Sequence, residues 1–421
     1  MPRATDRKSE VSGPKPEVQG PADSIVRLSI LVACASVLQV AESLFPHPLP
    51  GVRLGLANII TVIAMVYISP GSAIRLAVLR TLVSSMVLGT FLTPTFILSF
   101  SGGVASALVM VLLYRFSSGG GPFYFSLVGI SVGGAVSHIL TQVALVYLLF
   151  IRSSGVLLLW PWLACAAVVT GVITGLIAVQ AVRRLEEGSP RVKESGVRGF
   201  QCPDTRPLES PNHRPISFVH RLQPQFKVAA VVVIGLVVVV FSGYRLYLGV
   251  FGLLVVLAAL GRISPGRVAA GLERTWVLLV VALVMPVVFS PWGRVLLELG
   301  PVRVTDQGLH EGATFAARIL LLFFTTALLS QTTAPHELAG GLEKLLRPLR
   351  VFRVEPGRLA RSLSLSWSYF PQFWQSVRRM AGVSRGRKGW LDRTVHLPGD
   401  IVADMFRLAE QGAASAQDVT P

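Results

Sequence analysis

The stretch Val156–Val182, VLLLWPWLACAAVVTGVITGLIAVQAV, decides the fold class, because it runs for 27 residues without a charged side chain. An α-helix needs about 20 apolar residues to cross the hydrocarbon core of a bilayer, which is roughly 30 Å thick. Only helices and closed barrels satisfy their backbone hydrogen bonds in lipid, and this run is continuously apolar rather than alternating. The stretch therefore predicts a transmembrane helix.

Nine similar runs accompany this stretch, so we expect ten membrane spans and an all-α integral membrane protein. The predicted architecture is a six-helix bundle followed by about four transmembrane helices and then by cytosolic helices. The runs before the stretch are Ile25–Phe45, Val52–Ile68, Ala73–Phe91, Thr95–Tyr114 and Phe123–Ile151, and those after it are Phe226–Phe241, Tyr244–Leu260, Thr275–Phe289 and Leu309–Ser330.

The polar segments between these runs predict the domain boundaries. We expect a cytosolic tail at residues 1–24, a six-span domain at 25–183, a basic cytosolic linker at 184–224 and a second membrane part at 225–331. Residues 332–421 are predicted to be cytosolic. Within them, Pro335–Leu349 and Arg358–Gly386 are basic and amphipathic, a pattern typical of interfacial or cytosolic helices.

The charged residues are few but strongly biased. Of 421 residues, 52% are hydrophobic and 14% are charged, with a net charge of +17. This composition excludes an ordinary soluble enzyme and leaves a nucleic-acid-binding protein or a membrane protein. With the N-terminus inside, 32 of the 39 Lys and Arg residues lie on the cytosolic side. The charges thus follow the positive-inside rule, which favours a multi-pass plasma-membrane protein with both termini cytoplasmic and no nucleic-acid partner.

Catalytic motifs are missing from the chain. It has no P-loop motif and no D-D-x-x-D motif for prenyl diphosphate chemistry, and its three cysteines form no C-x-x-C pair. Residues 129–133, GISVG, match G-x-S-x-G but lie inside an apolar run, where Gly129 and Gly133 favour helix packing over a serine nucleophile. We therefore predict no enzymatic activity, no metal site and no cofactor in this chain.

Six polar or charged side chains interrupt the apolar runs of the first half. Such groups are costly at membrane depth unless they pair or face a cavity. They could also serve only as interhelical hydrogen-bonding groups, but together they favour one cavity in the outer half of the bundle, suited to an anionic or strongly polar solute. The predicted solute-binding residues are Glu42, Arg53, Asn58, Arg80, His138 and Gln142.

The first half resembles a known family. The first half is similar to the Gx transporter family, also called heptaprenyl diphosphate synthase component I. The matching stretches are Pro46–Gly55 with residues 54–59 (LGLANI), Leu79-Arg80, Gly89-Thr90 through Ser101-Gly102-Gly103, and Gly129–Gly134 followed by His138 and Gln142. Members look like the six-helix substrate-capture (S) components of energy-coupling-factor (ECF) importers. The second name implies instead an accessory subunit of polyprenyl diphosphate synthesis, which stays as the alternative function.

The second half resembles the transmembrane coupling (T) components of the same importers, the EcfT/CbiQ family. The matching stretches are residues 222–227 (LQPQFK), 304–309 (VTDQGL), Arg318, 332–338 (TTAPHEL) and 342–349 (LEKLLRPL). Residues 381–386 (AGVSRG) resemble the family's Ala-Arg-Gly coupling signature, with serine in place of alanine. The resemblance implies that the ATPase-coupling residues are Arg378, Arg379, Ser384, Arg385 and Gly386.

Together the two resemblances imply a fusion of an S component and a T component. The implied partners are two ECF-type ATPase subunits that hydrolyse Mg-ATP, a small-molecule solute and membrane lipid. Ser29 and Ala33, four residues apart, offer a small-residue face for packing between the S and T halves. A purely structural membrane scaffold is a third interpretation, but it leaves the intramembrane polar residues without a role.

Overall fold

The computed structural model describes residues 21–44, 55–118, 124–150, 160–186, 222–289, 293–299, 302–345, 347 and 356–383. Nearly all of these residues are helical, and six helices are long and apolar enough to cross a membrane. The chain is therefore an all-α integral membrane protein, as the apolar runs predicted. Of the predicted boundaries, the linker at 184–224 lies mostly outside the described residues.

The first half forms a helical bundle, called here the N-terminal bundle. Its elements are α1 (Pro21–Leu44), α2 (Leu56–Tyr67), α3 (Pro70–Leu88), α4 (Pro94–Ser118), α5 (Leu127–Leu145) with the π-helical extension η1 (Val146–Phe150), and α7 (Trp160–Glu186). Local chemistry sets the ends of α3. The Ser69 and Ser72 side chains form a capping box with Pro70 at the first helical position, and Gly89 ends the helix in the left-handed conformation with φ 67°.

The second half forms a separate helical unit, called here the C-terminal unit. Its elements are α9 (Pro224–Val240), α10 (Tyr244–Leu260), α11 (Pro265–Phe289), β1 (Val295–Leu299), β2 (Val302–Thr305), α12 (Asp306–Thr332), α13 (Pro335–Leu345) and α14 (Pro356–Val383). Helices α13 and α14 correspond to the predicted amphipathic segments, and the predicted ends at Leu349 and Gly386 lie outside the described residues.

All ten apolar runs form helices, but they differ in length. The six long apolar helices are α1, α3, α4, α5, α7 and α12, whereas α2, α9 and α10 are shorter. Helix α2 has 12 residues, which extend about 18 Å at 1.5 Å per residue. This is shorter than the hydrocarbon thickness and than the predicted span at Val52–Ile68, of which residues 52–54 lie outside the described part of the chain.

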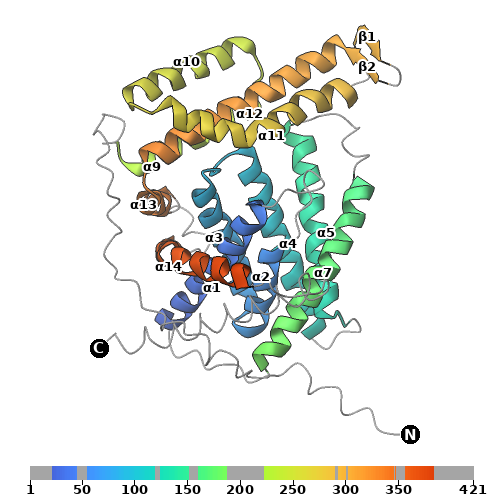
Figure 1. Ribbon diagram of the computed structural model, residues 1–421, viewed down its shortest axis with the longest axis vertical. Coiled ribbons are helices and arrows are strands. Elements are labelled where there is room, and N and C mark those ends of the chain that lie inside the picture. The colour runs from blue at the N-terminus through green and yellow to red at the C-terminus, as the bar shows by residue number, and fades with distance from the viewer. Residues whose placement is uncertain are drawn as a thin grey trace.

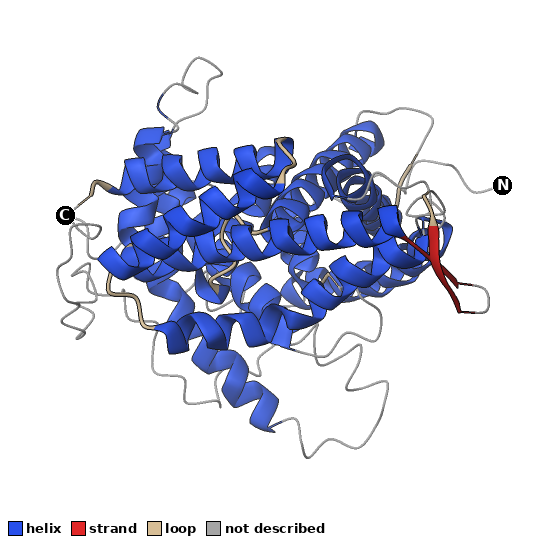
Figure 2. Ribbon diagram, turned by 90° about the horizontal axis from the view of Figure 1, so that it is seen from above, coloured by secondary structure: helices blue, strands red, loops and turns tan. Residues whose placement is uncertain are grey.

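A small β-hairpin departs from the all-helical prediction. Strands β1 and β2 pair antiparallel, with Leu299 opposite Val302, and lie at the edge of the molecule (Figure 2). The sequence carries a signal for it, since Gly300-Pro301 separates two runs rich in aliphatic residues. The hairpin leads into α12, whose N-cap Thr305 accepts a hydrogen bond from Gly308 N at 3.0 Å.

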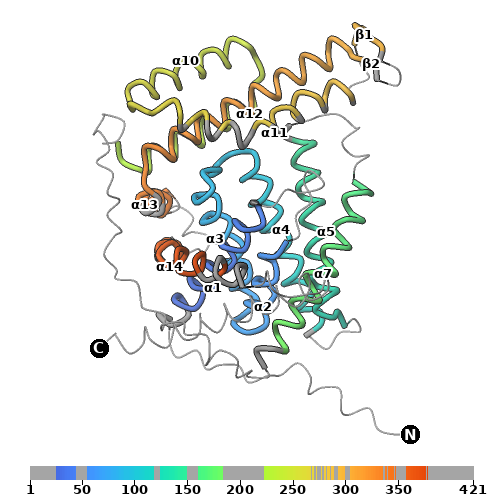
Figure 3. The backbone as a smooth tube through the Cα atoms, in the orientation of Figure 1, coloured from blue at the N-terminus to red at the C-terminus, as the bar shows by residue number. Residues whose placement is uncertain are grey.

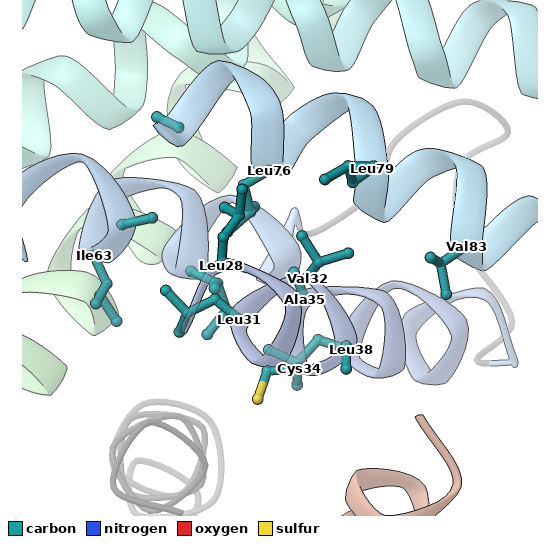
Figure 4. Packing of buried hydrophobic residues seen from close by; sticks show 14 of the residues in the cluster. Leu28, Leu31, Val32, Cys34, Ala35, Leu38, Ile63, Leu76, Leu79 and Val83 are labelled. Atoms are coloured by element: carbon teal, nitrogen blue, oxygen red, sulfur yellow. The ribbon is translucent and has the colours of Figure 1, made fainter. Parts of the chain in front are cut away.

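One hydrophobic core joins the two halves. It is built mainly from α1, α2 and α3, and Figure 4 shows Leu28, Val32 and Leu76 among the interleaved side chains. Helix α14 packs along α1 and extends this core with Tyr369 and Phe373, which are 1% and 0% exposed. The C-terminal unit is thus held to the N-terminal bundle by a buried hydrophobic interface and not only by its covalent connection.

The two halves cross each other. Helices α4, α5 and α7 run along the long axis of the molecule, whereas α10, α11 and α12 lie across it (Figures 1 and 3). Apolar side chains are exposed on both sets, including Leu112, Leu176, Phe251 and Leu283. Both sets therefore present surfaces suited to lipid, although their axes cannot all follow one membrane normal.

Close glycine contacts hold α5 against α7. A methyl group on Gly171 or Gly175 would come within 2.8 Å of the Cα atoms of Val132 or Val128. Backbone atoms cannot move aside as a flexible side chain can. These two glycines, four residues apart, therefore let the helices approach closely.

We predict that Gly175→Ala lowers the thermal unfolding temperature (Tm) of the purified protein, because overpacking costs about 1–3 kcal/mol. Gly249→Ala in α10 is the matched control, since a methyl group there would meet no neighbouring element within 4 Å. Both substitutions gain the helix propensity of alanine. An equal or higher Tm for Gly175→Ala relative to Gly249→Ala contradicts the close packing of α5 on α7.

Candidate functional site

A cavity of about 60 Å³, lined by both polar and apolar side chains, lies inside the N-terminal bundle. All six helices of the bundle contribute to its wall, and four of the six predicted solute-binding residues line it: Glu42, Asn58, Arg80 and His138. The structure thus brings together residues that lie up to 96 positions apart. The remaining wall residues are Gln39, Gly55, Ala57, Thr81, Ser99, Ala135, Ile139, Ala167, Thr170 and Thr174.

Glu42, near the end of α1, caps the start of α2. Its Oε1 accepts a hydrogen bond from Gly55 N at 2.7 Å, and its Oε2 accepts one from Leu56 N at 3.2 Å. The first backbone N–H groups of a helix have no partner within the helix, and they carry partial positive charge. Gly55 has no side chain to cap them and adopts φ 76°. A buried carboxylate from another helix therefore stabilises this end of α2.

Arg80, in the middle of α3, is the cationic group of the cavity. It is 5% exposed, and its Nη2 donates a hydrogen bond to Asn58 Oδ1 at 2.7 Å. Asn58 lies in the first turn of α2, so Glu42 and Arg80 both hold the start of that helix, one through the backbone and one through a side chain. A methyl group on Gly103 would lie 3.7 Å from Arg80 Nη2, which shows how closely α4 approaches the guanidinium.

His138 and Gln142 lie one turn apart on α5 but differ in their surroundings. The half-buried His138 lines the cavity and lies against Gly102 of α4, where a methyl group would come within 3.1 Å of the imidazole ring. Gln142 does not line the cavity; its Nε2 donates to Leu98 O at 3.5 Å. Gln142 therefore connects α5 to α4 by a hydrogen bond, which is the other role that the sequence allows for a polar residue inside an apolar helix.

The serine and threonine residues of the wall were not predicted from the sequence, because single small polar residues are common in apolar helices. Thr170 and Thr174 lie four residues apart on α7, and that spacing is the signal that could have found them. Ser131, the serine of the G-x-S-x-G match, lies inside α5 and pairs with Thr174 at 3.0 Å. Of the two glycines in that match, Gly133 packs closely on Leu113 of α4, whereas Gly129 meets only Ser126.

Among the residues of the C-terminal unit whose burial the structure describes, two cations are buried or half-buried, Lys227 and Arg318. Lys227, in the first turn of α9, donates from Nζ to Thr332 O at 3.0 Å, at the end of α12. A cation is stabilising where unpaired carbonyl groups end a helix. Arg318, in the middle of α12, donates from Nε to Tyr247 OH at 2.7 Å, which ties α12 to α10.

The remaining predicted residues concern the contact between halves and the coupling to partners. Ser29 and Ala33 are both 0% exposed, and Ser366 of α14 donates from Oγ to Ser29 O at 2.9 Å. Arg378 and Arg379 lie on the last turns of α14. Three coupling residues, Ser384, Arg385 and Gly386, and the solute-site residue Arg53 lie outside the described residues.

Comparison with known families assigns each half separately. Residues 31–181 match the family model described as heptaprenyl diphosphate synthase component I, and residues 216–402 match the model described as cobalt transport protein. The two halves of the chain match two different families. The component I match covers the bundle that holds the cavity, and the cobalt transport match covers α9–α14.

Relatives of the second half carry a more specific name. The energy-coupling factor transporter transmembrane protein EcfT of Listeria innocua is 30% identical over 171 residues, which make up 41% of this chain and 64% of the relative. EcfT of Thermosediminibacter oceani is 31% identical over 175 residues, or 40% and 64% of the two chains. The chain thus spans just under two thirds of these EcfT relatives, and it joins that EcfT-like segment to a component I-like bundle.

We predict that Glu42→Gln destabilises the bundle. Glutamine keeps the size of the side chain but offers one acceptor oxygen for the two N–H groups of Gly55 and Leu56. Losing a hydrogen bond to a buried charged group costs roughly 1.5–3 kcal/mol, so the Tm of the purified protein should fall by several degrees. Glu343→Gln, on α13, is the control. An unchanged Tm for Glu42→Gln contradicts the capping role.

Proposed function

We propose that the chain is the membrane subunit of an ECF-type importer, in which the N-terminal bundle captures a small solute and the C-terminal unit couples it to ATPase subunits. The observation that carries this proposal is the packing of α14, in the EcfT-like segment, directly on α1 of the bundle that contains the cavity. One chain thereby combines a solute site with a helix that is placed to move it.

The proposed mechanism needs ATPase subunits in trans. Two ECF-type ATPases bind the region around Arg378, Arg379 and Arg385, where arginines form charge-assisted hydrogen bonds with carboxylates of the partner. These subunits bind and hydrolyse Mg-ATP. Their closure moves α14, and α1 moves with it because the two helices share a buried core that includes Tyr369 and Phe373.

Transport requires the bundle to change its orientation. The proposed topology places both termini in the cytoplasm and puts the end of α1, the start of α2 and the cavity in the outer half of an upright bundle. In the structure, α4, α5 and α7 lie across the direction of α10–α12 (Figure 1). If α10–α12 follow the membrane normal, the bundle lies on its side, which is the orientation expected of a bundle that has tilted to deliver its solute inward.

The family description of the first half supports a second candidate, an accessory subunit of polyprenyl diphosphate synthesis. That function predicts a hydrophobic ligand and co-purification with a D-D-x-x-D synthase. The cavity favours the importer, since its wall carries two charged groups, two amides and several hydroxyls. A prenyl chain is apolar and cannot form hydrogen bonds with these groups.

We predict that Arg385→Glu abolishes the ATPase activity that co-purifies with the chain, because reversing the charge replaces attraction with repulsion at the docking surface. Activity is measured on the complex purified through a tag on this chain. Arg294→Glu, an exposed arginine beside the hairpin at the far end of α12, is the matched control.

The two variants also separate coupling from folding, because both should retain the Tm of the unmodified chain. Full ATPase activity in Arg385→Glu, or an equal loss in Arg294→Glu, contradicts the proposed docking surface. Co-purification of a prenyl diphosphate synthase instead of an ATPase contradicts the importer altogether.

A further inference from the structure

The chemistry of the cavity wall limits the kind of solute that fits it. Among the described residues that line the cavity, none has an aromatic ring apart from the imidazole of His138, and the longer side chains are mostly polar. Flat heteroaromatic compounds are commonly bound by stacking on aromatic side chains, and prenyl chains need an apolar groove. A small, strongly hydrophilic solute matches this wall better than either.

The guanidinium of Arg80 is the first of two charged groups in the cavity that can bind a charged solute group. Its one hydrogen bond to a described side chain goes to the neutral Asn58, and its buried Nε has no acceptor in the described part of the chain. Arg80 is 5% exposed and hydrogen-bonds to no described carboxylate, and the charge of Glu42 across the cavity offsets only part of the cost of burying it. An oxyanion in the cavity would remove this cost, since arginine binds carboxylates and phosphates through two parallel hydrogen bonds.

The carboxylate of Glu42 is the second group, and it has the opposite charge. Both of its oxygens accept backbone N–H groups of α2, and each oxygen can accept a further hydrogen bond. Glu42 and Arg80 line the same cavity but, within the described residues, form no ion pair with each other. The cavity therefore offers one fixed positive and one fixed negative group on separate helices.

We propose that the solute is a small zwitterion of the amino-acid type, with a carboxylate bound to Arg80 and an ammonium group directed to Glu42. The proposal rests on the importer function and adds the class of its substrate. The remaining wall groups, Gln39, His138 and the hydroxyls of Thr81, Ser99, Thr170 and Thr174, supply hydrogen bonds for polar atoms between the two charges.

The test measures Tm of the full chain in lipid nanodiscs over a concentration series of defined probes. L-alanine, β-alanine and 4-aminobutyrate carry both charges at increasing separation. Propionate and ethylamine match L-alanine with one charge removed, and isopentenyl diphosphate represents prenyl ligands. At least one zwitterion should raise Tm with saturation, and each single-charge analogue should bind at least tenfold more weakly.

Variants then assign the binding to the cavity. Arg80→Gln should weaken the binding of that zwitterion at least tenfold, whereas Arg75→Gln, an exposed arginine on the same helix, should leave it unchanged. Arg80→Lys keeps a positive charge but loses the paired donors, so it should also weaken binding. The comparison of probes on the unmodified chain remains decisive if a substituted chain does not fold.

Three results would contradict a zwitterionic solute. No zwitterion raises Tm, or a single-charge analogue or isopentenyl diphosphate binds as tightly as the best zwitterion. The third is that Arg80→Gln and Arg80→Lys both bind that zwitterion as tightly as the unmodified chain. ATPase co-purification from the same preparations tests the importer separately. A complex that assembles without any zwitterion effect overturns the solute class alone. Zwitterion binding without an associated ATPase overturns the importer and leaves the class of ligand standing.

Discussion

The contact between α1 and α14 is the interaction on which the rest of the structure depends. Ser366 donates a hydrogen bond across it to the backbone of Ser29, and Tyr369 and Phe373 of the same helix are fully buried in the shared core. Helix α1 also carries Glu42, which caps α2 at the edge of the cavity. Helix α1 therefore contacts α14 and also supplies part of the cavity wall, so a single helix connects the two features.

The cavity itself depends on α2 being short. Helix α2 starts inside the bundle at Gly55, and its exposed N–H groups would be costly to bury without an acceptor. Glu42 supplies that acceptor, and Arg80 holds Asn58 in the first turn. The polar residues that make the start of α2 possible are thus the same residues that give the cavity its charges.

Sequence patterns predicted the parts of this arrangement that depend on local composition. The ten apolar runs all became helices, and the search for charged and amide groups inside them found four residues of the cavity wall. The patterns did not reveal that α2 starts only at Leu56 or that Glu42 of α1 caps it, because this contact joins residues 13 positions apart on different helices. Nor could they show that Gln142 bonds to Leu98 or that Ser366 meets Ser29, which lies 337 residues away. Such pairings depend on tertiary packing, which hydrophobic periodicity does not encode.

The most direct test of this account is a disulfide between Ser29→Cys and Ser366→Cys in a chain whose three native cysteines are replaced and whose linker carries a protease site. After oxidation in native membranes and cleavage of the linker, the two halves should migrate as one band under non-reducing conditions and separate on reduction. Ser29→Cys with Gly249→Cys, on the distant helix α10, should give separate halves. Separate halves for the Ser29–Ser366 pair, or cross-linking as efficient in the control pair, would contradict the direct packing of α14 on α1.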